Sequence, residues 1–175
     1  VGSEMCIRDR THLPDINYAM PIFIDGEIVA FSCNIAHHAD VGGMVPGSMA
    51  GGMSEIYQEG LRIPVVKLFR KGELQQDIMD ILLLNVRVPN ERRGDHNAQI
   101  AACRLGARRL LEVIEENGLK NVLSAFDQII SRTARRMRSA ISEIPSGSYS
   151  FEDVMDGDGI NTVSYTHLRA HETKK

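Results

Sequence analysis

The alternation of apolar and polar residues changes its period along the chain. Residues 20–34 are rich in β-branched and aromatic side chains, and Asp25-Gly26, a preferred dipeptide for a type I′ turn, divides them. This pattern predicts a β-hairpin. A second short strand is predicted at residues 63–68, with Pro64 at its beginning or at a sheet edge. Between these strands, residues 36–60 follow neither period and are rich in glycine, methionine and histidine, which predicts a long functional loop.

Beyond this loop the apolar positions recur at helical spacing. A short helix is predicted around Ile78. Pro89 and Gly94 then interrupt the pattern, and Asp95 is a suitable N-cap for a longer second helix. That helix should end at Asn117-Gly118, because glycine favours the left-handed conformation that closes many helices.

Asn121 is a suitable cap for a third helix, which also has an apolar stripe. Two adjacent amphipathic helices joined by a few residues predict an antiparallel helical hairpin. The predicted fold class is therefore α+β: a β-hairpin and short strands with a long functional loop, followed by a helical hairpin.

The two ends of the chain continue none of these patterns. Residues 1–10 and 163–175 resemble read-through peptides translated from adapter sequence, so we expect a non-native leader and a non-native tail. Residues 11–162 then form a single partial domain. The alternative is that both ends are genuine disordered termini. The choice matters for His167 and His171, which would otherwise resemble an HxxxH metal-binding pair.

Composition narrows the class of protein. A chain of 175 residues is about one domain, and its net charge of −3 gives no field that would attract nucleic acid or an anionic membrane. No stretch approaches the roughly 20 apolar residues that a membrane span needs. The three cysteines are odd in number and form no CxxC pair, which indicates reduced thiols. We therefore expect a cytoplasmic protein with no nucleic-acid or membrane partner.

Two short histidine- and aspartate-containing strings flank the predicted hairpin. His12-Leu-Pro-Asp15 precedes it and His37-His38-Ala-Asp40 follows it, so folding of the hairpin would bring the strings together. Imidazole nitrogens with carboxylate oxygens suit zinc, manganese or iron. Histidines at these positions can equally be hydrogen-bonded structural residues, and Asp40 can be a turn former.

The order of motifs along the chain resembles the hydantoinase B/oxoprolinase family. The resemblance covers essentially all of the central 150 or so residues, and it rests on the following strings: His12-Leu-Pro-Asp15, His37-His-Ala-Asp-Val-Gly-Gly43, Pro46-Gly-Ser48, Glu55-Ile-Tyr-Gln-Glu-Gly-Leu-Arg-Ile-Pro64, Asn85-Val-Arg-Val-Pro89, Arg93-Gly-Asp95, Gln99-Ile-Ala-Ala102, Gly106-Ala-Arg-Arg-Leu110 and Phe151-Glu-Asp153. Many separate motifs in one order are far more specific than any one of them.

The resemblance implies the second subunit, or second half, of an ATP-dependent enzyme that opens cyclic amides such as hydantoins and 5-oxoproline. A hydantoinase A-like partner subunit or fused half would bind ATP and phosphorylate the amide, and this part would hydrolyse the activated intermediate. Acetone carboxylase subunits share the architecture, so a carboxylase subunit is one alternative. A scaffold fragment without chemistry of its own is another. The substrate and the native metal are left open.

The same resemblance implies that His12, Asp15 and His37 hold a divalent metal (zinc, manganese or iron). His38 and Asp40 are then candidates for orienting those ligands. The family has a further acidic ligand upstream of the HxxD string, where this chain has only residues 1–10. We therefore expect an internal fragment that is inactive alone.

Glu55 and Glu59, four residues apart near the end of the loop, are candidates for a catalytic base, or else solvated charges. The loop has glycines around Pro46-Gly47-Ser48 but lacks the GK[ST] ending of a P-loop. This absence agrees with ATP binding by a partner.

Overall fold

The computed structural model describes residues 12–150, which divide into two units between Val122 and Leu123. Strands and helices are mixed, as the sequence predicted. In chain order the elements are β1 (Asp15–Ile24), β2 (Glu27–His37), the 3₁₀ helix η1 (Ile56–Gln58), β3 (Phe69–Arg70), β4 (Glu73–Leu74), α2 (Gln76–Leu84), α3 (Pro89–Asn117) and α4 (Leu119–Ser142).

Strands β1 and β2 form a two-stranded antiparallel ribbon, which confirms the predicted hairpin. Its first pair is Asp15 opposite His37, and its last is Ile24 opposite Glu27. Asp25 and Gly26 both have positive φ, 50° and 84°, as a type I′ turn requires. This turn matches the right-handed twist of the strands and sets the pairing next to it. A register shift between Ile22 and Phe23, where β2 carries one extra residue, then brings Asp15 opposite His37.

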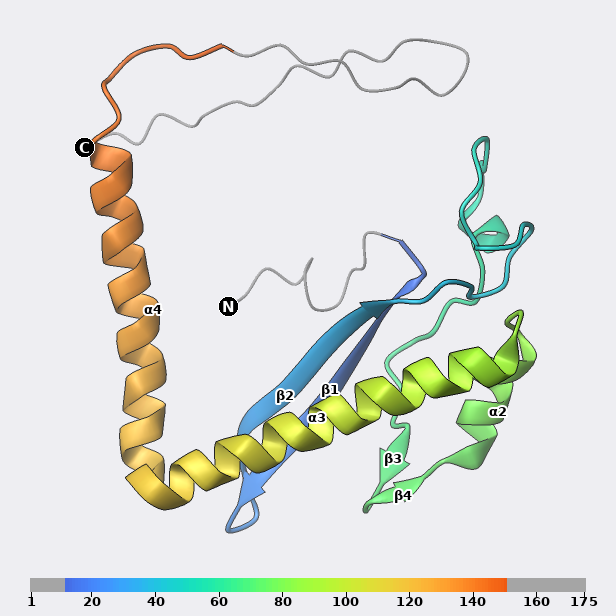
Figure 1. The fold of residues 1–175 in the computed structure, drawn as a ribbon, viewed down its shortest axis with the longest axis horizontal. Coiled ribbons are helices and arrows are strands. Elements are labelled where there is room, and N and C mark those ends of the chain that lie inside the picture. The colour runs from blue at the N-terminus through green and yellow to red at the C-terminus, as the bar shows by residue number, and fades with distance from the viewer. Residues whose placement is uncertain (1–11, 151–175) are drawn as a thin grey trace. The chain divides into compact units, whose positions relative to one another are not determined.

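Helix α3 packs against β1 and β2 and crosses the ribbon (Figure 1). Its buried positions recur at helical spacing. Three of them are polar, Arg92, His96 and Gln99, and the other three are Cys103, Ala107 and Ile114. Gly106 allows the close approach, because a Cβ at this position would collide with the Ser32 hydroxyl oxygen on β2. The ribbon in turn buries Ile16 and Ile22.

The predicted interruption at Pro89 and Gly94 is wrong. Helix α3 begins at Pro89 and continues through Gly94. Proline is favoured in the first turn because an N–H group at that position would have no hydrogen-bond partner within the helix, so its absence costs nothing. Asp95 is consequently an interior residue rather than a cap, and its carboxylate lies 3.1 Å from the Arg92 guanidinium. The predicted end is confirmed, since Gly118 closes the helix with a φ of 79°.

The predicted strand at residues 63–68 is also wrong. This stretch has no regular structure, and the pair β3–β4 forms instead at Phe69–Arg70 and Glu73–Leu74. Val65 is 95% exposed, so the β-branched side chains here have no neighbouring sheet on which to pack. The predicted short helix is confirmed as α2, which buries Met79, Leu82 and Leu83.

Only Gly118 separates α3 from α4, and Asn121 lies inside α4, where its side chain donates to the Asn117 carbonyl oxygen. Asn121 is therefore not the predicted cap. The link at Gly118 is shorter than the roughly two to five residues of a typical helical hairpin, and the predicted helical hairpin stays a prediction. Residues 123–150 form a unit of their own, in which Phe126, Ile129 and Ile130 are exposed. Within residues 12–150, no helix is long and apolar enough to cross a membrane.

The close approach at Gly106 has a measurable consequence. Gly94→Ala should raise the free energy of unfolding by up to about 1 kcal/mol, because alanine favours helix and a Cβ there meets nothing. Gly106→Ala should give no such gain, because the Ser32 hydroxyl must move away. Adding Ser32→Ala should restore it. Urea unfolding followed by circular dichroism measures the stability of all three variants. Equal stabilisation by Gly94→Ala and Gly106→Ala would contradict the contact between position 106 and Ser32.

Candidate metal centre

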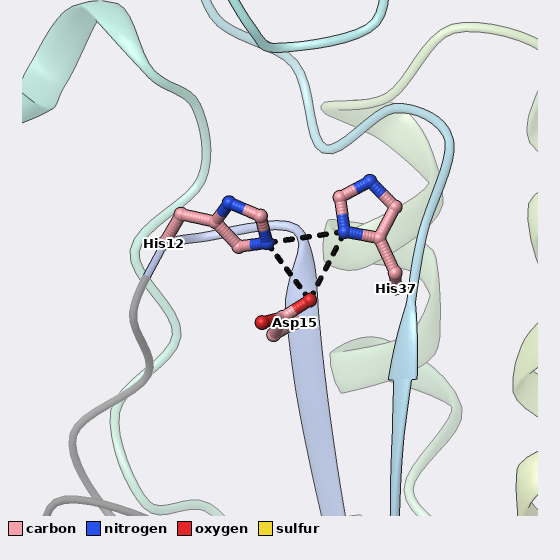
Figure 2. A group of neighbouring side chains, drawn as sticks. All are labelled: His12, Asp15 and His37. Atoms are coloured by element: carbon pink, nitrogen blue, oxygen red, sulfur yellow. Dashed lines mark hydrogen bonds and ion pairs between the residues drawn. The ribbon is translucent and has the colours of Figure 1, made fainter. Parts of the chain in front are cut away.

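The ends of the ribbon bring together the three side chains that the sequence singled out. His12 stands in the turn before β1, Asp15 is the first residue of β1, and His37 is the last residue of β2. The turn is closed by the Asp15 amide, which donates to the His12 carbonyl oxygen, and Pro14 inside it is buried. All three side chains point toward one another (Figure 2).

The three atoms that face each other form a nearly equilateral triangle. Asp15 Oδ1 lies 2.9 Å from His12 Nε2 and 3.0 Å from His37 Nδ1, and the two nitrogens are 3.1 Å apart. Ligand bonds of roughly 2.0–2.2 Å place neighbouring ligand atoms about 3 Å apart around zinc or a similar ion. These residues therefore fit a divalent metal.

The triangle is open to solvent. The side chains of His12, Asp15 and His37 are 33%, 20% and 48% exposed. Three protein ligands with open positions are typical of catalytic rather than structural metal sites, because water or substrate can complete the coordination. Among residues 12–150, these three make up the one group of three or more His, Cys, Asp or Glu side chains close enough together to hold a metal.

His38 turns in the opposite direction from His37, into the interior. Its Nε2 donates to Gln99 Oε1 at 2.8 Å, and its ring lies 4.6 Å from that of His96. Its main-chain N–H donates to the Pro14 carbonyl oxygen at 2.8 Å, which ties the two ligand-bearing ends together. The predicted role of His38 in orienting the ligands stays a prediction. The hydrogen bond from its main-chain N–H to Pro14 is the contact through which it could act.

A buried pair reinforces the contact between α3 and β1. The Tyr18 hydroxyl and His96 Nδ1 lie 2.9 Å apart. Burial is the main cause that lowers the pKa of His96 to about 4 and raises the pKa of Tyr18 to about 12. Both groups are therefore neutral over the physiological range, as a buried hydrogen-bonded pair should be.

Asp40 organises the loop that follows the ribbon. Its buried carboxylate accepts the N–H groups of Gly42, Gly47 and Arg87, and the Arg87 guanidinium, all at 2.9–3.0 Å. Burial acts to raise the pKa of Asp40, but these hydrogen bonds outweigh it and lower the pKa to about 2. Arg87 also donates to the carbonyl oxygens of Gly43 and Val45. Asp40 thus contacts the loop rather than the triangle, and its role in orienting the ligands stays a prediction.

Two glycines let the loop pack tightly against its surroundings. Gly42 has a φ of 89°, and a Cβ there would collide with the Asn85 carbonyl oxygen. Gly60 has a φ of 135°, and a Cβ there would collide with the Val41 carbonyl oxygen. The loop's backbone is therefore held at both ends of the segment that carries Glu55 and Glu59.

Those two glutamates frame the 3₁₀ helix η1. Glu55 precedes it and Glu59 follows it, and the Gln58 side chain accepts the N–H of Glu55. Neither belongs to the group of ligand atoms formed by the triangle. Their assignment as a catalytic base stays a prediction.

The buried polar residues of α3 were not singled out as site residues from the sequence. His96, Gln99 and Cys103 lie on the helix face toward the ribbon, where Asn34 on β2 meets the last two. A signal was present in their spacing, which is that of one helix face. This spacing was overlooked because the buried face of an amphipathic helix is normally recognised by its apolar residues, and two of these three are polar.

A family model described as Hydantoinase B/oxoprolinase matches residues 3–173. The chain belongs to the hydantoinase B/oxoprolinase family. It is 38% identical over 148 residues to a putative D-/L-hydantoinase subunit from Pseudomonas sp. (strain NS671), covering 84% of this chain and 25% of that protein.

Two solved structures have the same fold over much of the chain. The ATP-dependent caprolactamase from Pseudomonas jessenii superposes with a TM-score of 0.77 at 35% identity, over 83% of this chain and 25% of that one. A nucleotide-free acetone carboxylase superposes with a TM-score of 0.60 at 29% identity, over 63% and 14%. The chain therefore spans about a quarter, or less, of the length of these relatives.

The expected leader and tail, and with them His167 and His171, lie outside the described residues. So does the region upstream of His12, where the resemblance places a further acidic ligand. These expectations stay predictions.

Asp40 makes stability depend on acidity. Its folded pKa of about 2 is below the ordinary 3.8, so its contribution is present above pH 4 and is lost as the pH falls from about 4 to 2. Asp40→Asn should cost about 2 kcal/mol at pH 7 and flatten that part of the profile. Urea unfolding between pH 2 and 7 measures both effects. Asp25→Asn, which makes the same substitution at an exposed turn residue, provides the control.

Proposed function

We propose that this chain supplies a divalent-metal centre to the hydrolytic subunit of an ATP-dependent enzyme that opens cyclic amides. The observation on which the proposal rests is the triangle of His12 Nε2, Asp15 Oδ1 and His37 Nδ1, with sides of 2.9–3.1 Å. Family membership and the names of two relatives, a hydantoinase subunit and a caprolactamase, support the choice of cyclic amides as substrates.

The donor set fits zinc, manganese or iron, which accept mixtures of imidazole and carboxylate. A divalent ion bound there would acidify a water molecule and polarise the carbon of an activated amide. The chain's own residues hold the two imidazoles against one carboxylate and leave the solvent side open to substrate. Glu55 and Glu59 are the candidates for moving the proton of the attacking water.

The energy of ATP would enter through a partner. Cyclic amides resist hydrolysis, so the proposal assigns their phosphorylation to a hydantoinase A-like, ATP-binding subunit or fused half. The Pseudomonas relative is named as one subunit of a hydantoinase, which supports such a division. Because this chain spans only about a quarter of its relatives, we expect it to be inactive alone.

An acetone carboxylase-type subunit is the second candidate, supported by the superposition on acetone carboxylase at a TM-score of 0.60. The same metal centre would then act on a phosphorylated ketone instead of a cyclic amide. A non-catalytic scaffold, the third hypothesis, has no need of a stoichiometric metal ion.

Metal binding is tested with the chain itself. Wild type should bind one Zn²⁺ or Mn²⁺ per chain in equilibrium dialysis with elemental analysis. His12→Ala, His37→Ala and Asp15→Asn should each weaken binding at least about 100-fold, since loss of a ligand exceeds the 10–100-fold typical of outer residues. Glu27→Gln, at the other end of the same ribbon, is the matched control and should bind normally. Full occupancy in His12→Ala and His37→Ala would refute the ligand assignment.

The substrate class is tested with the full-length parent protein and its ATP-binding partner. ATP hydrolysis should be stimulated by hydantoin, 5-oxoproline or caprolactam, and His37→Ala should abolish ring opening while the complex still assembles. Stimulation by acetone with bicarbonate, and by none of the cyclic amides, would instead select the carboxylase hypothesis.

A further inference from the structure

The Gln99 side chain extends from α3 to the two strands at the end of the ribbon where the ligands lie. This residue is buried, and its Nε2 donates to the Ile16 carbonyl oxygen and to Asn34 Oδ1, each at 2.9 Å. Its Oε1 accepts from His38 Nε2 at 2.8 Å. One side-chain amide thus bonds β1, β2 and the residue that follows β2.

The positions of these partners relate them to the metal triangle. Ile16 directly follows Asp15, and His38 directly follows His37. Asn34 lies three residues before His37 on the same strand. Gln99 therefore holds the chain one residue away from each of two ligands.

The chemistry of the partners fixes the orientation of this amide. The Ile16 carbonyl can only accept, so Nε2 must face it, and Oε1 must then face His38. Asn34 reciprocates by donating to the Gln99 main-chain carbonyl at 2.9 Å. Both N–H groups and the oxygen of Gln99 are used, so rotation of the side chain would leave buried polar atoms unpaired.

The ligands need such support from elsewhere. Asp15 and His37 form the terminal pair of a two-stranded ribbon, and such ribbons are at best marginally stable on their own. All three ligand side chains are partly exposed, so their positions depend on the buried residues next to them in sequence, such as Ile16 and His38. A buried side chain from a third element can hold those residues in place.

We propose that Gln99 is a positioning residue for the metal centre, setting the separation of the Asp15 and His37 backbones through Ile16 and His38. The proposal rests on the metal function proposed above. Its effect on affinity follows from geometry, because a displacement of a few tenths of an ångström at either end opens a triangle whose sides are 2.9–3.1 Å.

The test compares two substitutions at the interface of α3 with the ribbon, in the full chain. Gln99→Met keeps the side-chain volume and removes all three hydrogen bonds. Tyr18→Phe removes the bond to His96 from the same interface. Neither Tyr18 nor His96 is next in sequence to one of the three ligands. Gln99→Met should weaken Zn²⁺ or Mn²⁺ binding by about 10–100-fold, whereas Tyr18→Phe should change it by less than about threefold. Calorimetric titration at a temperature where circular dichroism shows folded protein gives both values.

A second readout needs no metal. The His38 amide donates to the Pro14 carbonyl, and its hydrogen exchange, relative to core amides of α3, should accelerate in Gln99→Met but not in Tyr18→Phe. If Gln99→Met folds poorly, Gln99→Glu keeps the shape and the acceptor for His38, loses the donors, and should show the same two changes.

The outcomes separate this proposal from the one it rests on. Wild-type affinity in folded Gln99→Met, or equal losses in both variants, would overturn the positioning role. A wild-type chain that binds no divalent ion would overturn the proposed function instead. In that case the exchange of the His38 amide decides, because an unchanged rate in Gln99→Met shows that Gln99 does not hold the ribbon's end.

Discussion

Asp15 stands opposite His37 in the β1–β2 ribbon, and the candidate metal centre depends on this register. The two residues are brought together by the tight turn at Asp25-Gly26, by the pairing of the strands, and by the register shift between Ile22 and Phe23. Because strand side chains alternate between faces, a slip of one residue would turn His37 toward α3 and expose its neighbour instead. The register therefore decides which of two adjacent histidines can meet Asp15, and His12 follows through the short turn closed on Asp15.

A ribbon of two strands cannot maintain such a register alone, and α3 supplies the missing support. The support is polar as well as apolar. Gln99 and His96 are buried on the helix face that meets the ribbon, and they hydrogen-bond residues on both strands or just beyond them. Buried amides and imidazoles are costly unless every donor and acceptor is paired, so this interface tolerates few alternative arrangements. Apolar packing alone would allow the helix to slide along the ribbon more easily.

The loop after the ribbon is also held by hydrogen bonds to a buried polar side chain, that of Asp40. Asp40 collects three backbone N–H groups and the Arg87 guanidinium, which fixes the chain immediately beyond His38. The centre is thus supported twice, by α3 against the ribbon and by the Asp40–Arg87 pair in the loop. The remaining side of the triangle is open to solvent.

The sequence pattern by itself determined the hairpin with its type I′ turn, the end of α3 at Gly118, and the approach of the two histidine- and aspartate-containing strings. The choice of His12, Asp15 and His37 within those strings came from the family resemblance. Tertiary structure decided the rest. Residues 63–68 have strand propensity but no sheet to join. The buried role of Gln99 escaped prediction for a related reason. A polar side chain becomes an interior residue only when its partners, more than sixty positions away, arrive to pair with it.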